Sequence, residues 1–479
     1  MSAATIETDY LIIGSGAVGM AFADTIFHET SADIVIVDRH HGPGGHWNDA
    51  YPFVRLHQPS AYYGVNSRPL GGDSRDTHPL NRGMCERATA AEIVSYYESL
   101  MQAFVASGRV RYFPMSDCAG DDTGDHHITS LLGGDRQTVQ FSKKVVDTTY
   151  LNTAVPSTHP PQYATAAGLR CIPLNDLPKL RAPPSGYVVV GAGKTGIDAC
   201  LWLLENGVSP AAISWVMPRD SWFINRANVQ PGDEFFMQSI GGMARQMACV
   251  AEAESAESLF AQLEAHDQLL RLDPTVPPTM YHAATVSHAE LDALRTIKQV
   301  IRLGRVVCIE ADQIVLQQGS VPSDPQRLYV DCSASAAERR PAVPIFQGRR
   351  IVPQFVRAFQ PTFSAALIAH VDGLFDDDEK KNQICGVVPL PDTPLSWLSM
   401  QAASMNNMYR WSKTKGLGAW IAASRLDGFS RLIDDVDESD AEKVAVLELM
   451  GKSVVPAAMK LPQLLAKAAT QQQAEAATG

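Results

Sequence analysis

Residues 9–22, DYLIIGSGAVGMAF, decide the fold, and residues 186–199, GYVVVGAGKTGIDA, repeat their design. Each stretch is a run of strand formers, then Gly-x-Gly-x-x-Gly, then the apolar start of a helix. The first glycine allows a tight turn, the second lets a pyrophosphate approach the backbone, and the third lets the helix pack closely on the strand. The helix then aims its free N–H groups and positive dipole end at the phosphates. The sequence therefore predicts two dinucleotide sites.

The residue at the end of the second strand of each unit indicates which dinucleotide fits. In the first unit DIVIVD ends in Asp38, about 20 residues past the third glycine, where an acid binds a ribose hydroxyl and repels a 2′-phosphate. This favours FAD or NAD. In the second unit AISWVMPRD carries Arg219, whose guanidinium suits the 2′-phosphate of NADPH. The neighbouring Asp220 leaves open the alternative that Arg219 is a surface charge at a strand end.

Two dinucleotides in one chain imply hydride transfer from a nicotinamide to a flavin. We therefore expect FAD to be held at the first loop and NADPH, which reduces it, to bind at the second. The residues expected to contact FAD are Gly14, Gly16, Ala17, Val18, Gly19, Asp38 and Arg39. Those expected to contact NADPH are Gly191, Gly193, Lys194, Thr195, Gly196 and Arg219.

Composition limits the classes of function. The 479 residues are 45% hydrophobic, enough for about two to four domains with buried cores. A net charge of −12 argues against a nucleic-acid binder, which needs clustered Lys and Arg. The eight cysteines include no Cys-x-x-Cys pair, which argues against a metal site or a redox dithiol. Without a basic signal region or an apolar stretch of about 18 residues, we expect a cytoplasmic enzyme and no membrane contact.

The region after Asp38 resembles the flavin-containing monooxygenases and the Baeyer–Villiger monooxygenases. The motifs that carry the resemblance are Gly44-Gly45-His46-Trp47, similar to Gly-Gly-x-Trp; Tyr51-Pro52 with Arg55, similar to Tyr-Pro-Gly-x-Arg; and Pro59-Ser60-Ala61-Tyr62, similar to Pro-Ser-x-Tyr. The likeness covers most of residues 5–370. The chain lacks the Phe-x-Gly-x-x-x-His fingerprint before the second loop, and its Ala-Thr-Gly strand end reads Asp147-Thr148-Thr149. It is therefore identified as a member of a sister group of two-dinucleotide flavoproteins.

The resemblance implies further flavin contacts. Gly45, His46 and Trp47 are expected near the ribityl chain, and His57 and Gln58 near the isoalloxazine. His57 replaces an Asp of the Baeyer–Villiger pattern and is equally open to a structural role.

A second flavin contact is expected from a helix beginning at Gln360, Pro361 and Thr362. Its N-terminal dipole would stabilise the anionic reduced flavin. Pro361 suits the first helical turn.

Four residues are candidates for steering the oxygen chemistry. His57 is one. Asn66 lies slightly offset from an Asn that the flavin-containing monooxygenases place beside the flavin. Arg226 and Arg357 carry the charge to stabilise a peroxide anion, as an Arg does in the Baeyer–Villiger group. For Asn66, Arg226 and Arg357, each taken singly, a structural role is the leading alternative.

The expected fold class is α/β, with two Rossmann-like dinucleotide-binding domains, the second inserted in the first, and a C-terminal helical region. The expected segments are the FAD domain at 1–155 with its return at 336–388, a proline-rich linker at 156–184, the NADPH domain at 185–335 with a helical insertion at 230–303, and helices at 389–479 ending in a frayed tail. Residues 89–107 form an amphipathic helix that opens with a Thr89–Glu92 capping box.

The implied function is that of an FAD-dependent monooxygenase, which uses NADPH and molecular oxygen to oxygenate a small organic substrate through a flavin hydroperoxide. Two alternatives stay open: an FAD-dependent oxidoreductase that does not oxygenate, and a non-enzymatic FAD/NADPH redox sensor. The Met and aromatic residues of the later helices are typical of a buried interface and leave a homo-oligomer open.

Overall fold

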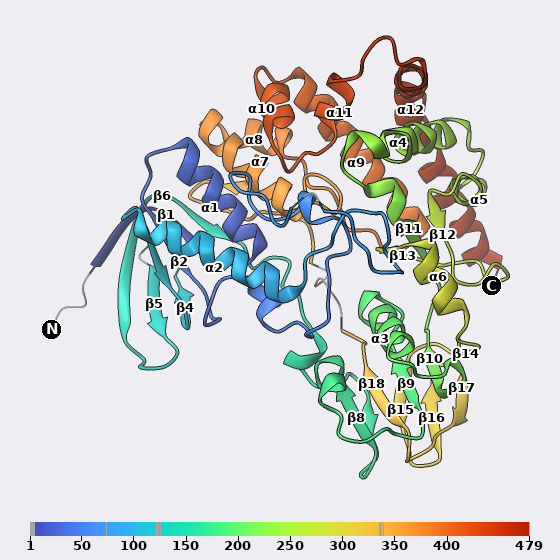
Figure 1. The fold of residues 1–479 in the computed structure, drawn as a ribbon. Coiled ribbons are helices and arrows are strands. Elements are labelled where there is room, and N and C mark those ends of the chain that lie inside the picture. The colour runs from blue at the N-terminus through green and yellow to red at the C-terminus, as the bar shows by residue number, and fades with distance from the viewer. Residues whose placement is uncertain are drawn as a thin grey trace.

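A computed structural model describes residues 5–72, 74–120, 124, 126–334, 338 and 340–478. Figure 1 shows a first α/β unit in blue to cyan, a second in green to yellow, and C-terminal helices in orange to red above both. The chain returns to the first sheet after completing the second, so the second unit is inserted in the first. The predicted fold class is therefore confirmed.

The first sheet is a Rossmann sheet with the order β19-β20-β6-β1-β2-β3. Its strands are β1 (Thr5–Ile13), β2 (Ile34–Val37), β3 (Val110–Phe113), β4 (Ser116–Ala119), β5 (His126–Ser130), β6 (Arg136–Asp147), β19 (Phe346–Gln347) and β20 (Arg350–Ile351). Strands β2 and β6 flank β1 in parallel, and Ile13 is in register with both Val37 and Asp147. The carboxyl ends of the central strands thus meet beside Gly14.

The antiparallel meander on this sheet is formed by β4, β5 and β6. Strand β3 precedes it in the chain and pairs in parallel with β2 at the edge of the Rossmann sheet. The turn at Met115 then starts the meander.

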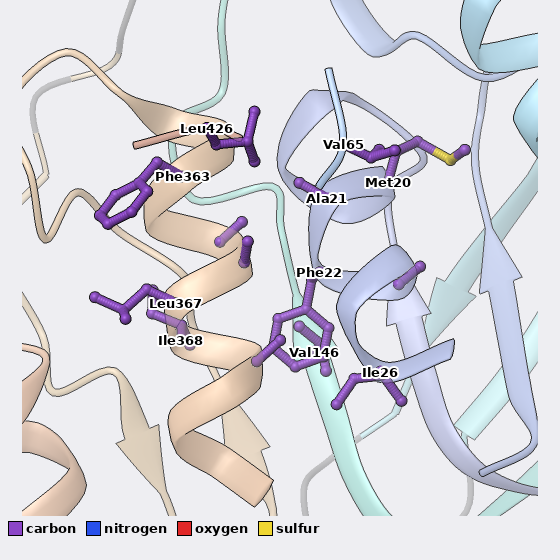
Figure 2. Close-up of a cluster of buried hydrophobic side chains, with 14 of the residues drawn as sticks. Met20, Ala21, Phe22, Ile26, Val65, Val146, Phe363, Leu367, Ile368 and Leu426 are labelled. Atoms are coloured by element: carbon purple, nitrogen blue, oxygen red, sulfur yellow. The ribbon is translucent and has the colours of Figure 1, made fainter. Parts of the chain in front are cut away.

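Two apolar helices, α1 (Ala17–Glu29) and α7 (Pro361–Leu374), pack against each other beside the first sheet. Figure 2 shows Phe22 of α1 directed toward α7, with Phe363 and Leu367 on the facing helix. These side chains are fully buried, and a Phe→Ala change in such a core costs about 3–5 kcal/mol. This packing fixes the N-terminal ends of both helices.

Helix α2 (Ala90–Ala106) forms as predicted, and it packs against the same core as α1 and α7. The capping box between Thr89 and Glu92 is present, and the predicted apolar stripe is buried. Both features are local, because they join residues within about one helical turn of each other.

The second Rossmann sheet has the order β14-β10-β9-β18-β8. Its strands are β8 (Arg170–Pro173), β9 (Tyr187–Val190), β10 (Ile213–Val216), β14 (Gln299–Ile301) and β18 (Leu328–Asp331), and α3 (Lys194–Glu205) follows β9. The interpretation of residues 156–184 as a linker was wrong for β8, which pairs in parallel with β18. Backbone pairing with a distant strand overrides the local proline signal.

The predicted helical insertion at 230–303 is only partly helical. It holds the helices α4 (Phe236–Glu252), α5 (Ala256–Ala265) and α6 (His288–Arg295) and the strands β12 (Leu269–Leu270), β13 (Met280–Val286) and β14. Strand β13 pairs in parallel with β11 (Ser221–Asn225), with a shift of register between Trp222 and Ile224. The prediction missed these strands because their partners lie outside the insertion or far along it.

A small sheet not foreseen from the sequence has the order β17-β16-β15-β7. Its strands are β7 (Ala164–Thr165), β15 (Val306–Ile309), β16 (Gln313–Leu316) and β17 (Gly319–Pro322). It shares an apolar cluster with β9 and β18, so it covers one face of the second sheet.

The C-terminal region is helical, as predicted. It consists of α8 (Asp378–Ile384), α9 (Pro394–Lys413), α10 (Leu417–Ala423), α11 (Ser430–Asp434) and α12 (Ala441–Thr478). Helix α12 packs on α4 of the insertion and on α9 of the C-terminal region (Figure 1). The expected frayed tail continues α12 up to Thr478. Within the described ranges, no helix has the length and hydropathy needed to cross a membrane.

Candidate functional site

The first glycine loop uses its three glycines in different ways. Gly14 has φ +99°, and a Cβ there would lie 2.5 Å from Thr148 Oγ1. A Cβ on Gly19 would collide with the carbonyl oxygen of Gly14. A Cβ on Gly16 would meet Gly45 Cα at 3.5 Å, an ordinary contact. The fold therefore requires Gly14 and Gly19, whereas the open side of Gly16 faces the place where a ligand would lie.

Helix α1 starts at this loop, and its N-cap is Gly16. No side chain among the described residues caps the N–H groups of its first turn. Such groups need a partner, and an anion is a suitable one. Ala17 and Val18 line a cavity of about 1250 Å³. This volume exceeds the roughly 300–1,000 Å³ of ordinary small-ligand pockets and suits a dinucleotide together with a second molecule. The residues present therefore fit FAD.

The predicted ribose-binding acid, Asp38, lies in the cavity wall and is already strongly hydrogen bonded. Its Oδ2 accepts from Ser15 N at 2.5 Å and Ser15 Oγ at 2.8 Å, and its Oδ1 accepts from His40 N at 2.8 Å. His40 Nδ1 lies 2.8 Å from the same Oδ1. Burial alone would raise the pKa of Asp38, but the hydrogen bonds from His40 and Ser15 outweigh it and leave the pKa lowered. Asp38 is thus held ionised.

His40 couples Asp38 to Asp49, because its Nε2 lies 2.9 Å from Asp49 Oδ2. The hydrogen bond to Asp38 raises the pKa of His40 to about 9, and Asp49 adds to the rise against the opposing effect of burial. His40 is therefore protonated at neutral pH. A ribose hydroxyl bound by Asp38 therefore has to share the carboxylate with Ser15 and protonated His40. Arg39, also in the wall, forms a bidentate pair with Asp117.

Gly45 and His46 line the cavity beside the loop, together with Tyr63. Burial lowers the pKa of His46 to about 4, so its imidazole is neutral at physiological pH. Trp47 lies behind this wall and donates its indole N–H to Tyr63 Oη at 2.8 Å. Trp47 thus orients a wall residue.

The second glycine loop has the same turn with other neighbours. Cβ atoms on Gly191 and Gly196 would collide with backbone carbonyl oxygens. No described atom lies within 4 Å of a Cβ built on Gly193. Helix α3 follows with Gly193 as N-cap and, within the described part of the chain, no side-chain cap. This loop therefore also fits a pyrophosphate.

Lys194 and Thr195 begin α3. Lys194 is ion paired with Asp198, which also accepts a 2.5 Å hydrogen bond from Tyr51 Oη of the first domain. Burial lowers the pKa of Lys194 against the attraction of Asp198. Tyr51 thus ties the first domain to the helix that carries the second loop.

Arg219 and Asp220 lie near the end of β10 and have separate partners. Asp220 is paired bidentately with Arg302, at 2.8 and 3.1 Å, so its charge is compensated. Arg219 makes a 3.4 Å contact with Asp392, and its side chain is 37% exposed. Because this contact is long, the guanidinium of Arg219 remains able to bind a phosphate.

Two of the candidate catalytic residues lie outside the cavity wall. Arg226 is fully buried and pairs with Glu290 at 2.6 Å. It also donates to the carbonyl oxygens of His57 and Thr285. Burial holds the pKa of His57 well below its usual value, and Lys194 and Arg226 lower it further. Both residues belong to a structural network between the domains. Gln58 also lies outside the cavity wall.

The other two catalytic candidates are also engaged elsewhere. Arg357 pairs with Asp427 at 2.6 Å and lies over the ring of Phe363. Asn66 Oδ1 accepts a hydrogen bond from Ser424 at 2.9 Å. The structure therefore does not bring Asn66, His57, Arg226 and Arg357 together. The sequence alone does not show which partner a charged or amide side chain will bind in the folded protein.

The N-terminus of α7 does reach the cavity. Pro361, in the first helical turn as predicted, lines it, while Gln360 is the buried N-cap. The buried hydroxyl of Thr362 has no hydrogen-bond partner among the residues described. An uncapped helix end with a free donor beside it fits the negative charge of a reduced flavin.

The sequence did not predict the far end of the cavity. The wall there is formed mainly by Phe355, Phe359, Val387, Val388 and Leu390, with His282, Asp392 and Ser396 beside them. These residues come from β13, the segment before α7, the segment before α9 and the first turn of α9. The proline-rich run at 389–394 signals a loop, and nothing local in it signals a cavity wall.

Comparison with known proteins agrees with this geometry. Residues 12–65 match a family model described as an NAD(P)-binding Rossmann-like domain. An open crystal structure of cyclohexanone monooxygenase has a similar fold, with TM-score 0.50 and 14% identity over 77% of this chain and 87% of that chain. The fold is therefore one that cyclohexanone monooxygenase shares. The predicted resemblance is confirmed at this level.

The chain belongs to the same family as two uncharacterized proteins of mycobacteria. Uncharacterized protein Rv2000 of Mycobacterium tuberculosis and uncharacterized protein Mb2023 of Mycobacterium bovis are each 45% identical to it, over 98% of this chain and 87% of the relative.

Proposed function

We propose that this protein is an FAD-dependent, NADPH-consuming monooxygenase that oxygenates a small organic molecule. The observation that carries the proposal is the uncapped N-terminus of α1, which opens beside Gly16 onto a cavity of about 1250 Å³. When bound there, FAD supplies hydride acceptance and oxygen activation. The chain supplies position, charge and exclusion of water.

The first domain would hold FAD along the cavity. Ala17 and Val18, which line the cavity, would donate their N–H groups to the pyrophosphate, and Asp38 in the same wall would bind the adenosine ribose. Pro361 places the positive end of α7 in the same wall. This end would stabilise negative charge that develops during reduction.

The second domain would hold NADPH. Gly193 leaves the space that a pyrophosphate requires, and Lys194 adds a cation at the start of α3. Arg219 is the candidate for the 2′-phosphate, because Asp220 is neutralised by Arg302. The apolar far wall, with Phe359 and Leu390, would keep water away from the reacting atoms.

The proposal is tested with purified protein that has retained its flavin. NADPH is added without oxygen and flavin bleaching is recorded, and oxygen is then admitted with a panel of cyclic ketones, amines and phenols. A monooxygenase bleaches, consumes one oxygen per NADPH, and releases less hydrogen peroxide when a substrate is present. Bleaching with peroxide yields that no panel member lowers indicates an oxidoreductase that does not oxygenate. Absence of bleaching would leave the redox-sensor alternative.

A further inference from the structure

His282 and Asp392 meet in the wall at the apolar end of the cavity. His282 lies on β13 of the second domain, and Asp392 precedes α9. His282 Nε2 is 2.5 Å from Asp392 Oδ1, and both residues line the cavity. The His282 side chain is 40% exposed. Segments separated by 110 positions are thus joined at this point.

The backbone holds this pair in place from both sides. The carbonyl oxygen of Asp392 accepts from Tyr281 N at 3.0 Å. The amide of Asp392 donates to Ser396 Oγ at 2.8 Å. Ala283, next to His282, has φ +55°, a conformation that L residues adopt rarely and that is found where the surroundings impose it. The His282 ring is therefore positioned by its neighbours.

The carboxylate determines which nitrogen of His282 can act as a base. A carboxylate accepts hydrogen bonds, so Nε2 carries the hydrogen that points to Asp392. In the neutral imidazole, Nδ1 then has the free lone pair. Arg219 also contacts Asp392, at 3.4 Å. The arrangement is that of an oriented histidine base.

The residues around this base are apolar and partly aromatic. The partly exposed side chains of Phe355 and Phe359 lie in the same wall, together with Val388 and Leu390. Aromatic walls suit a flat ring, and a histidine base oriented by a carboxylate at the edge of apolar groups suits a ligand with a weakly acidic hydroxyl.

We propose that this end of the cavity binds a phenol, or a similar apolar molecule with one weakly acidic hydroxyl, and that His282 accepts its proton. The O–H bond breaks and an Nδ1–H bond forms, leaving a phenolate opposite an imidazolium that Asp392 stabilises. A phenolate is more electron rich than the phenol and is the better target for oxygenation. This inference rests on the proposed function and names its substrate class.

The chain contains a matched control for this pair. His288 Nε2 lies 2.9 Å from Asp267 Oδ1, and both side chains are 56% exposed. This histidine–aspartate pair lies outside the cavity wall. A variant of His288 thus removes the same chemical group without touching the proposed site.

The test uses flavin-containing protein titrated with 4-nitrophenol, whose phenolate absorbs differently from its neutral form, at a pH below its pKa in water. Non-ionisable 4-nitroanisole is the reference ligand. We expect the wild type to bind the phenol at least about tenfold more tightly than the anisole and to show the phenolate signal. His282→Gln should lose both, Asp392→Asn should lose the phenolate signal, and His288→Gln should keep both.

Equal affinities for the two ligands in the wild type, or a phenolate signal that survives in His282→Gln, would overturn the inference. Flavin content and reduction by NADPH are measured in the same samples. Wild-type protein that NADPH does not reduce would refute the proposed function, while the difference spectrum would still decide the role of His282.

Discussion

The two glycine loops have one backbone design and two different surroundings. In the first, Ala17 and Val18 open onto a large cavity whose wall also includes His282 of the second domain. In the second, Lys194 is paired with Asp198, and Asp198 accepts a hydrogen bond from Tyr51 of the other domain. The first loop is thus built to enclose a ligand, and the second lies against the partner domain. This difference fits one cofactor that stays and one that comes and goes.

The three glycines of each loop differ in the space around them. In both, the first and third glycines face backbone or Thr148 at distances no Cβ would tolerate. In both, the middle glycine alone has room on its open side. Substitution of Gly16 or Gly193 therefore tests ligand binding, whereas substitution of Gly19 or Gly196 tests folding.

The largest effect is expected for Gly16→Val. Displacing a pyrophosphate from two charge-assisted hydrogen bonds costs about 3–6 kcal/mol, more than about 100-fold in affinity. The variant should purify colourless with an unchanged circular dichroism spectrum. Gly19→Ala is the contrast, because it should lower the yield of folded protein. A yellow Gly16→Val protein would show that the first loop does not hold FAD.

Gly193→Val should separate the two loops. The protein should remain yellow, and its Kd for NADPH should rise by about 100-fold, because the same kind of contact is lost at the other site. Stopped-flow reduction at increasing NADPH concentrations measures this. Unchanged saturation by NADPH would remove the second loop from the cofactor site.

A smaller effect is expected for Arg219→Ala. Loss of one charge pair with a 2′-phosphate should weaken NADPH by about 2–3 kcal/mol and leave NADH unchanged. Arg305→Ala, at an exposed position of the same domain, is the control. Equal losses for NADPH and NADH would mean that Arg219 serves only its contact with Asp392.

The smallest effect concerns pH. The pKa of His40 is about 9 when folded, above its ordinary value near 6.5, so protonated His40 stabilises the fold fully below about pH 6.5 and loses this effect as pH rises through about 9. Because the side chain is 32% exposed, we expect about 1 kcal/mol. Denaturant unfolding of the wild type and His40→Asn should differ at pH 6 and converge by pH 9.5. A pH-independent difference would contradict this.

Long-range pairing explains the errors of prediction. Strand β8 lay in a segment whose prolines indicated a linker, yet it pairs with β18 far along the chain. Arg226 was a candidate for stabilising a peroxide anion, with a structural role as the leading alternative, and Glu290 and the His57 carbonyl occupy its guanidinium. A residue type shows what a side chain can do, and its partner decides what it does.

The sequence by itself determined the two strand–glycine–helix units, the capping box at Thr89 and the helical start at Pro361. These features depend on residues within a few positions of one another, and such interactions are visible in a linear pattern. Tertiary structure alone decided the wall of the cavity and the meeting of His282 with Asp392. Those contacts join segments that only the packing of two domains brings together, and no local preference encodes their distance.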